Sequence, residues 1–423
     1  MNKRTLAQGG KALKKTIRKS MVLVGVLLAV LLFGQAVMAA EYNVTCSLDY
    51  TGPYAVIMPP FESARKSLFA WWNETKGKEL GIKLNDKGYD MRYDPSVVAS
   101  TWPGILTGDK PIAHMGLGGP DVAALMKRLP NDKVPLVMST GTYGFIWLPG
   151  TWVFQPRPTY AHEAAGFFNW VHMNQIKDRP IRIGAINSKV SPAYVDMING
   201  IESFCKATPW AECVGTEWVQ MKPVSLTSEV RRLARQKPDF IWIATNTTHV
   251  IGAIKAMKEL DIHIPLVLAS HCGIQMSALA SKDITLLEGH YDAYAMDPAI
   301  DRNVPGAKVV IDYSQKLGIK DNWSIVGVQA ALMQLLTLRG IERAAEKVGA
   351  DKVTGEAVYN AMFEKPFTEN DLLGLAPTLT FTHNAPFSEK DLKVKATTVK
   401  GGKQVMVTDE WIPVPEIPNW VQK

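Results

Sequence analysis

Residues 237–270 read KPDFIWIATNTTHVIGAIKAMKELDIHIPLVLAS and carry the clearest structural signal in the chain. The short apolar run at 240–245 predicts a buried strand, and residues 265–270 predict a second one. Between them, the residues 246–248 (Asn-Thr-Thr) supply helix N-cap side chains, and apolar residues within 250–260 recur on one helical face. The stretch therefore predicts one β-α-β crossover with short connections.

Similar signals recur on both sides of this unit. Residues 61–75 have apolar side chains at helical spacing. Compact runs rich in Val and Ile occur at 44–48, 111–117, 135–139 and 181–186. Such runs fit strands buried on both faces, as in a parallel sheet covered by helices. A second strand-helix-strand unit is expected over 181–219, so the predicted fold class is α/β.

The last forty residues differ from the rest. Apolar and polar residues alternate in short runs on either side of Gly401 and Gly402, which predicts a hairpin within 381–407. The proline-containing segment 411–420 predicts an ordered but irregular strap.

The first forty residues have the composition of an export signal. A basic segment without acidic residues precedes the apolar run 21–33, and small residues lead to Ala39 and Ala40. This order is typical of a secretory signal peptide, here with cleavage after Ala39 or Ala40. The apolar run is shorter than the roughly 20 residues that a spanning helix needs. We therefore expect an exported protein.

The net charge of +7 comes entirely from this segment, because the remaining residues hold 40 basic and 40 acidic side chains. The charge therefore gives no argument for nucleic-acid binding, and we expect none.

Four cysteines follow the export signal. Cys205 and Cys213 flank a loop between a predicted helix and a predicted strand, so a local disulfide is expected. Cys46 lies in an apolar strand and is expected to be buried, whereas the state of Cys272 stays open. No zinc spacing is present, so we predict no metal.

Sequence motifs of catalysis are absent. The chain has no H-E-x-x-H, G-x-S-x-G or Walker A motif, and the glycines at 116–119 fail the G-x-G-x-x-G spacing. Ser139, His271 and Cys272 are the candidates for a nucleophile and its base. We accordingly predict no enzyme activity and no cofactor, with a cleft hydrolase as the least favoured alternative.

Seven short motifs together suggest a family. In chain order they are LDYTGPYA at 48–55, GIKLN at 81–85, MRYDP at 91–95, VPLVMS at 134–139, FQPRPTY at 154–160, KPDFI at 237–241 and GHY at 289–291. In this order and spacing they resemble the branched-chain amino-acid-binding, type I family of periplasmic substrate-binding proteins of ABC transporters (the leucine/isoleucine/valine-binding-protein-like family).

The resemblance implies a two-lobed flytrap fold, in which each lobe is a parallel sheet flanked by helices and the chain crosses a hinge three times. Lobe one would comprise 41–156 plus 292–372, and lobe two 157–291 plus 373–423. It also implies a small-molecule ligand in the cleft, a membrane permease of an ABC transporter as partner, and a monomer.

Candidate ligand contacts follow from two sources. Open α/β sheets bind ligands at the carboxyl ends of their strands, which nominates Gly119, Ser139, Thr140, Ser191, Thr245, Asn246 and His271. The resemblance implies that Ser139 and Thr140 hold a carboxylate and that Tyr160 closes the cleft. The alternative for each is a turn or cap residue.

Aromatic side chains are also expected around the cleft and hinge, with core packing as the alternative for most of them. They are Trp102, Tyr143, Phe145, Trp147 and Trp152.

Two departures from the family pattern bear on the ligand. Residues 116–120 lack a hydroxyl that the family commonly provides, and SHCG at 270–273 stands where amino-acid binders place an acidic residue. A buried ammonium without an anionic partner is costly. We therefore expect an extracytoplasmic receptor for an amino-acid-like solute or a small carboxylic acid or amide, aromatic ones included, and favour the acid or amide. A periplasmic sensor feeding a signalling receptor is the alternative.

Overall fold

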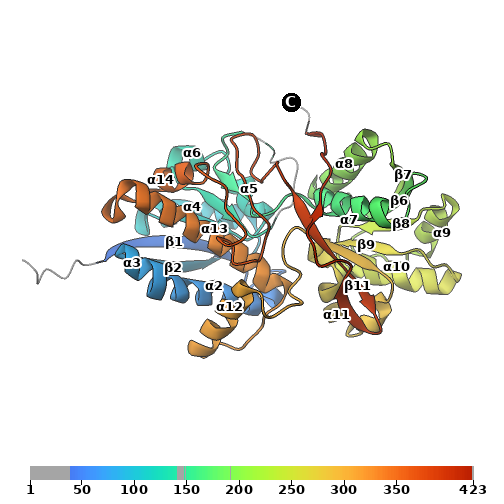
Figure 1. Ribbon diagram of the computed structural model, residues 1–423, viewed down its shortest axis with the longest axis horizontal. Helices are drawn as coiled ribbons and strands as arrows, with labels where there is room; N and C mark the ends of the chain where they lie inside the picture. The colour runs from blue at the N-terminus through green and yellow to red at the C-terminus, as the bar shows by residue number, and fades with distance from the viewer. Residues whose placement is uncertain (1–38, 141–146, 148, 191, 422–423) are drawn as a thin grey trace, which may run out of the picture. The chain divides into compact units, whose positions relative to one another are not determined.

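The computed structural model describes residues 39–140, 147, 149–190 and 192–421. From Glu41 onward the chain forms one compact unit that contains two sheets (Figure 1). Residues 1–38, which make up all but the end of the predicted signal peptide, and residues 141–146, 148, 191, 422 and 423 lie outside the described part of the chain. Ser191, Tyr143 and Phe145 are among them.

The first sheet has five strands in the order β2-β1-β3-β4-β5. The strands are β1 (Ala40–Leu48), β2 (Ile82–Asp90), β3 (Ala113–Gly116), β4 (Leu136–Met138) and β5 (Val153–Phe154). β1, β3, β4 and β5 pair in parallel, with Cys46 opposite Met115 and Met115 opposite Val137. All residues of β3 and β4 are buried, as expected for strands with helices on both faces.

The second sheet is mixed. Its strands are β6 (Ile181–Asn187), β7 (Ala211–Trp218), β8 (Phe240–Ile243), β9 (Leu266–Ala269), β10 (Tyr291–Tyr294), β11 (Lys393–Lys400), β12 (Lys403–Met406) and β13 (Ile412–Pro413). β6 to β10 pair in parallel, whereas β11 pairs antiparallel with β10, β12 and β13. Gly401 and Gly402, both with positive φ, make the β11–β12 turn and confirm the predicted hairpin.

Helices connect the strands and flank both sheets. They are α2 (Met58–Trp72), α3 (Lys78–Leu80), α4 (Pro95–Gly108), α5 (Gly119–Leu125), α6 (Leu129–Asp132), α7 (Tyr160–Asn174), α8 (Pro192–Ala207), α9 (Thr227–Arg235), α10 (Thr247–Leu260), α11 (Ile274–Ser281), α12 (Pro305–Lys316), α13 (Ile325–Val348) and α14 (Gly355–Ala361). In the β8-α10-β9 crossover, the Asn246 side chain accepts a hydrogen bond from the His249 N–H at 3.0 Å, which confirms the predicted N-cap.

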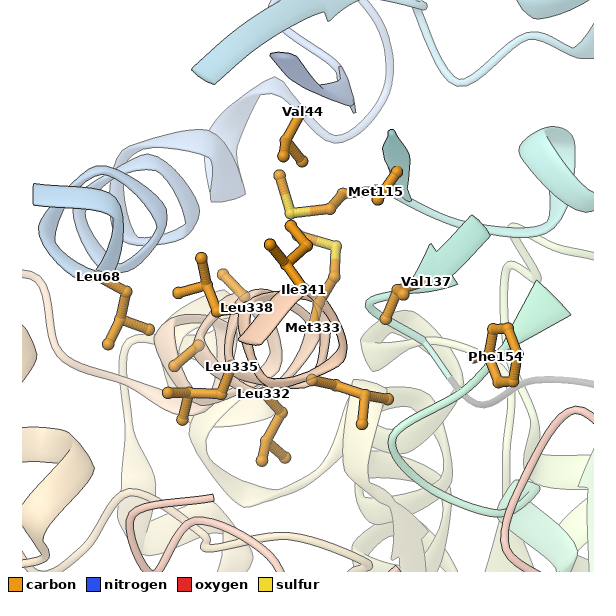
Figure 2. Close-up of a cluster of buried hydrophobic side chains, with 14 of the residues drawn as sticks. Val44, Leu68, Met115, Val137, Phe154, Leu332, Met333, Leu335, Leu338 and Ile341 are labelled. Carbon is orange, nitrogen blue, oxygen red and sulfur yellow. The ribbon is translucent and has the colours of Figure 1, made fainter. Parts of the chain in front are cut away.

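Helix α13 is the centre of the first core, a role that the sequence analysis did not predict. Figure 2 shows its side chains, among them Met333 and Ile341, beside Val44 of β1 and Met115 of β3. The helix is long and apolar enough to span a membrane, but 94% of its apolar 18-residue window is buried inside the protein. It is therefore a core helix of the folded unit.

The chain crosses between the two cores three times. It leaves the first after β5, returns after β10, and leaves again between Phe381 and β11, since Phe381 belongs to the first core and Val394 to the second. The predicted two-lobed α/β fold with three crossings is thus confirmed.

Two lobe boundaries differ from the prediction. β10 lies in the second sheet because it pairs with both β9 and β11, although lobe one was expected to resume at 292. Residues 373–381 pack in the first core, where Leu379 bridges to Phe367, rather than in lobe two.

The cysteines agree with expectation where one was made. Cys205 and Cys213 form a disulfide, and Cys46 is buried and free. Cys272, which the sequence left open, is also buried and free.

Candidate functional site

A cavity of about 380 Å³ lies where strand ends of the two lobes face each other, within the size range of small-molecule sites. From lobe one, its lining follows the carboxyl ends of β1 to β4 and includes the start of α13. From lobe two, it follows the ends of β6, β7 and β9 and the starts of α7 and α8. The lining residues are Tyr54, Ile57, Phe61, Tyr93, Leu117, Ser139, Thr140, Tyr160, Val190, Ala193, Tyr194, Met197, Met221, His271, Met276, Ile325, Val326 and Gln329.

The lining is mainly aromatic and aliphatic. Four tyrosines and three methionines contribute to it, and Ser139, Thr140, His271 and Gln329 supply the other polar side chains. None of the described lining residues is an Asp, Glu, Lys or Arg. Such a surface favours a solute with substantial apolar area and a few directed hydrogen bonds.

Four predicted contacts line this cavity. Ser139 and Thr140 follow β4, Tyr160 begins α7, and His271 follows β9. The rings of Tyr160 and His271 lie 4.3 Å apart between centroids. The strand-end rule thus nominated residues of both lobes that line one cavity.

Two other predicted contacts serve the local fold instead. Thr245 shares a 2.6 Å hydrogen bond with Nδ1 of His249, and Asn246 caps α10. Neither lines the cavity. The Thr245 carbonyl, however, accepts a 2.7 Å hydrogen bond from Nε2 of His271, so this residue positions His271.

Gly119 is the first residue of α5; it is buried and also lies outside the lining. There is a structural reason for glycine at the neighbouring position 118, because a Cβ there would lie 2.5 Å from the Tyr93 ring. A glycine at 118 therefore allows Tyr93 to reach the cavity wall.

The three tryptophans that were expected around the cleft and hinge do not line the cavity. Trp102 is fully buried in a separate cluster, where its indole donates to Asp132 at 2.8 Å and lies against His114. Trp152 stacks on Tyr359, and Trp147 packs against Phe387. The aromatic lining comes instead from Phe61 and the four tyrosines, of which only Tyr160 had been predicted.

Other lining residues were missed because no local pattern marks them. Met197, Met221 and Met276 lie on three different segments of the chain, and Gln329 lies on the unpredicted helix α13. Tyr54 is the exception, since it belongs to the TGPYA motif.

A buried charge network lies behind Tyr160. Arg157 donates to the Tyr160 hydroxyl at 2.9 Å and to the Ser270 hydroxyl at 2.8 Å, and it pairs with Glu163 at 3.4 Å. Both charged side chains are fully buried. Burial raises the pKa of Glu163, and the adjacent Arg157 guanidinium opposes that rise. The network ties α7 to the segment after β9.

Among the described residues, neither Ser139 nor Cys272 is hydrogen-bonded to a base. The Ser139 hydroxyl donates to the Leu117 carbonyl at 2.7 Å, and the Cys272 thiol donates to the Ile243 carbonyl at 3.4 Å. Burial raises the pKa of Cys272 to about 12, which keeps the thiol protonated. An activated nucleophile shares a hydrogen bond with a base instead of donating to a backbone carbonyl. No cluster of three or more metal-ligating side chains occurs among the described residues.

Sequence comparison decides the family. Residues 41–389 match the model of a periplasmic binding protein family. The chain belongs to this family. No curated protein sequence matches it. Family membership supports a receptor for a small solute outside the cytoplasm, as the sequence analysis expected.

Solved structures of ABC transporter binding proteins share the fold at low identity. A branched-chain amino-acid transporter protein of Thermus thermophilus with bound valine is 17% identical, with a TM-score of 0.73 over 90% of this chain and 97% of that one. A fatty-acid transporter binding protein of Thermomonospora curvata is 19% identical (TM-score 0.70, 90% and 94% coverage). A solute-binding protein of Rhodopseudomonas palustris in complex with benzoate is 16% identical (TM-score 0.67, 90% and 99% coverage).

Proposed function

We propose that this binding protein captures a small organic solute in the cavity between its lobes and delivers it to the membrane permease of an ABC importer. The observation that carries the proposal is the cavity itself, because it combines a lining from both lobes with strand-end polar groups. A ligand there contacts both lobes at once, so binding favours the closed arrangement. Ser139, Thr140, Tyr160 and His271 are the proposed polar contacts.

The proposed setting is the periplasm. The basic and apolar segments within 1–40 support export with cleavage after Ala39 or Ala40. The solved relatives are transporter binding proteins, which supports a permease as the partner. The proposed receptor is a monomer, as the resemblance to the family implies.

The lining argues against a zwitterionic amino acid as the ligand. An ammonium group buried in this cavity would meet no carboxylate among the described lining residues, and such a charge is costly without a partner. The valine bound in one solved relative therefore does not transfer directly to this chain. A mainly apolar solute fits the aromatic and methionine-rich walls better.

The test is native purification of residues 41–423 followed by release of any bound compound for mass spectrometry. Thermal melts with added amino acids, amides, alcohols and acids would accompany it. A ligand at a hundredfold over its Kd should add about 2.7 kcal/mol to the free energy of unfolding. A stabilising compound recovered unchanged supports a receptor, whereas conversion to a product would refute the proposal and favour an enzyme.

A further inference from the structure

Gln329 carries the one side-chain amide in the described lining of the cavity. It lies one turn beyond Ile325 on helix α13, so the two side chains share a helical face, and both line the cavity together with Val326. Its amide has no hydrogen-bond partner among the described residues. Gln334, farther along the helix, has an unpaired amide that is fully buried, whereas Gln329 is 8% exposed and its amide keeps surface that a molecule in the cavity can reach.

The other polar side chains of the described lining place weaker demands on a ligand. In one group, the contacts proposed above, most polar atoms are already hydrogen-bonded to the protein or covered by it: Ser139, Thr140, Tyr160 and His271. The other group consists of the tyrosines whose hydroxyls can each donate or accept: Tyr54, Tyr93 and Tyr194. Gln329 differs from both groups, because its Nε2 only donates and its Oε1 only accepts.

The Gln329 amide therefore requires a ligand group that accepts and donates at adjacent atoms. A ligand that fills the cavity displaces water from this amide, and a buried polar atom left unpaired lowers the affinity. A primary carboxamide presents its carbonyl oxygen to Nε2 and a neighbouring N–H to Oε1. An alcohol has one hydroxyl for these two atoms.

A carboxylate fits this position poorly. It only accepts hydrogen bonds, so it would leave Oε1 of Gln329 unpaired. It would also meet no Lys or Arg in the described lining, and residues 141–146, 148 and 191 contain none in sequence. A carboxylate entering here would lose hydration without gaining a cationic partner.

We propose, on the basis of the receptor function above, that Gln329 binds the ligand directly and that the cavity selects a mainly apolar solute whose primary carboxamide pairs with the Gln329 amide through two hydrogen bonds. The aromatic and methionine side chains of the lining then hold the apolar part of the solute. Gln329 sets the preference for the amide over the acid or the alcohol of the same carbon skeleton.

The experiment compares ligands that differ only in this group, by titration calorimetry on the purified chain from residue 41 at pH 7.5. One set is benzamide, benzyl alcohol and benzoate; the second is 4-methylpentanamide, 4-methylpentanol and 4-methylpentanoate. In at least one set, the amide should bind about tenfold more tightly than both other members, because only the amide satisfies both atoms of Gln329.

Two variants and a control locate the effect. Gln329→Met keeps the length of the side chain and removes both polar atoms, so the amide should lose about tenfold in affinity and its preference should disappear. Gln329→Glu turns the site into an acceptor, so it should bind benzamidine, a cation with donors only, about tenfold more tightly than the wild type does. The control is Gln315→Met, at an exposed position of α12 outside the cavity, which should change no affinity.

The outcomes separate this inference from the receptor function. An acid or alcohol that binds as tightly as its amide in both sets, or a Gln329→Met variant that keeps the amide preference, refutes the inference and leaves the receptor function intact. If Gln329→Met does not fold, the wild-type ranking and Gln329→Glu still decide. Failure of both amides to bind also refutes the inference, whereas any other compound recovered unchanged from the native protein would still support the receptor.

Discussion

Replacing Glu163 with glutamine should destabilise the fold far more than an ordinary substitution. The Glu163 carboxylate pairs with Arg157 at 3.4 Å and accepts hydrogen bonds from the Ser270 hydroxyl at 2.8 Å and from the N–H groups of Ser270 and Ala295 at 3.2 Å each. Neither charged side chain reaches solvent. Glutamine keeps the shape but removes the charge, so the guanidinium is left buried without a counter-ion.

The expected cost follows from this geometry. Breaking a fully buried ion pair by removing one partner costs about 3–5 kcal/mol, because the other charge stays desolvated. The glutamine NH2 group would also face backbone donors that the carboxylate now satisfies, which adds to the cost. Removing both charges in Arg157→Met with Glu163→Gln should cost less than the sum of the single changes, since no charge is then left uncompensated.

A double-mutant cycle measures these free-energy costs. It uses urea unfolding at pH 8 of the wild type, both single variants and the double variant. The matched control is Glu212→Gln, which breaks the exposed pair with Arg182 and should cost less than about 1 kcal/mol. The reasoning is refuted if Glu163→Gln costs no more than that control, or if the single costs add up in the double variant.

Three further predictions concern other parts of the fold. Burial lowers the pKa of His114 to about 3, well below the ordinary value of 6.5. The free energy of unfolding is therefore unaffected by this group above pH 6.5. It falls at lower pH, because the unfolded chain takes up a proton there and the folded chain does not. The stability difference between wild type and His114→Gln should therefore shrink by about 1.4 kcal/mol per pH unit from 6.5 towards 4; parallel urea profiles would contradict this. Replacing both Cys205 and Cys213 with serine should cost about 2–3 kcal/mol, and a reductant should lower the melting temperature of the wild type only. Trp102→Phe should lower the free energy of unfolding by about 1–3 kcal/mol through lost packing and the lost hydrogen bond to Asp132, and it should leave the ligand Kd unchanged. A Kd altered more than threefold would indicate that Trp102 contacts the ligand after all.

Local features of the chain were predictable where local physics determines them. The β8-α10-β9 unit follows from hydrophobic periodicity and the Asn246 cap, and the β11–β12 hairpin follows from its paired glycines. The disulfide follows from the short loop that its cysteines flank. Ser139, Thr140 and His271 were nominated because parallel strands bring their carboxyl ends to one edge of a sheet, whereas Tyr160 was nominated by the family resemblance.

The remaining features depend on which segments meet in three dimensions. Tyr93 follows strand β2 and Trp102 lies in the next helix, α4, yet Trp102 belongs to a core cluster and Tyr93 to the cavity wall. Helix α13 contributes Gln329 from more than 180 residues beyond Ser139, a distance over which sequence periodicity carries no information. Periodicity reports that a side chain is buried but not against what, because that depends on packing between distant elements. The sequence by itself therefore determined the α/β units and the sheet edge at which the cavity lies, while the tertiary structure alone decided which distant side chains form the cavity walls.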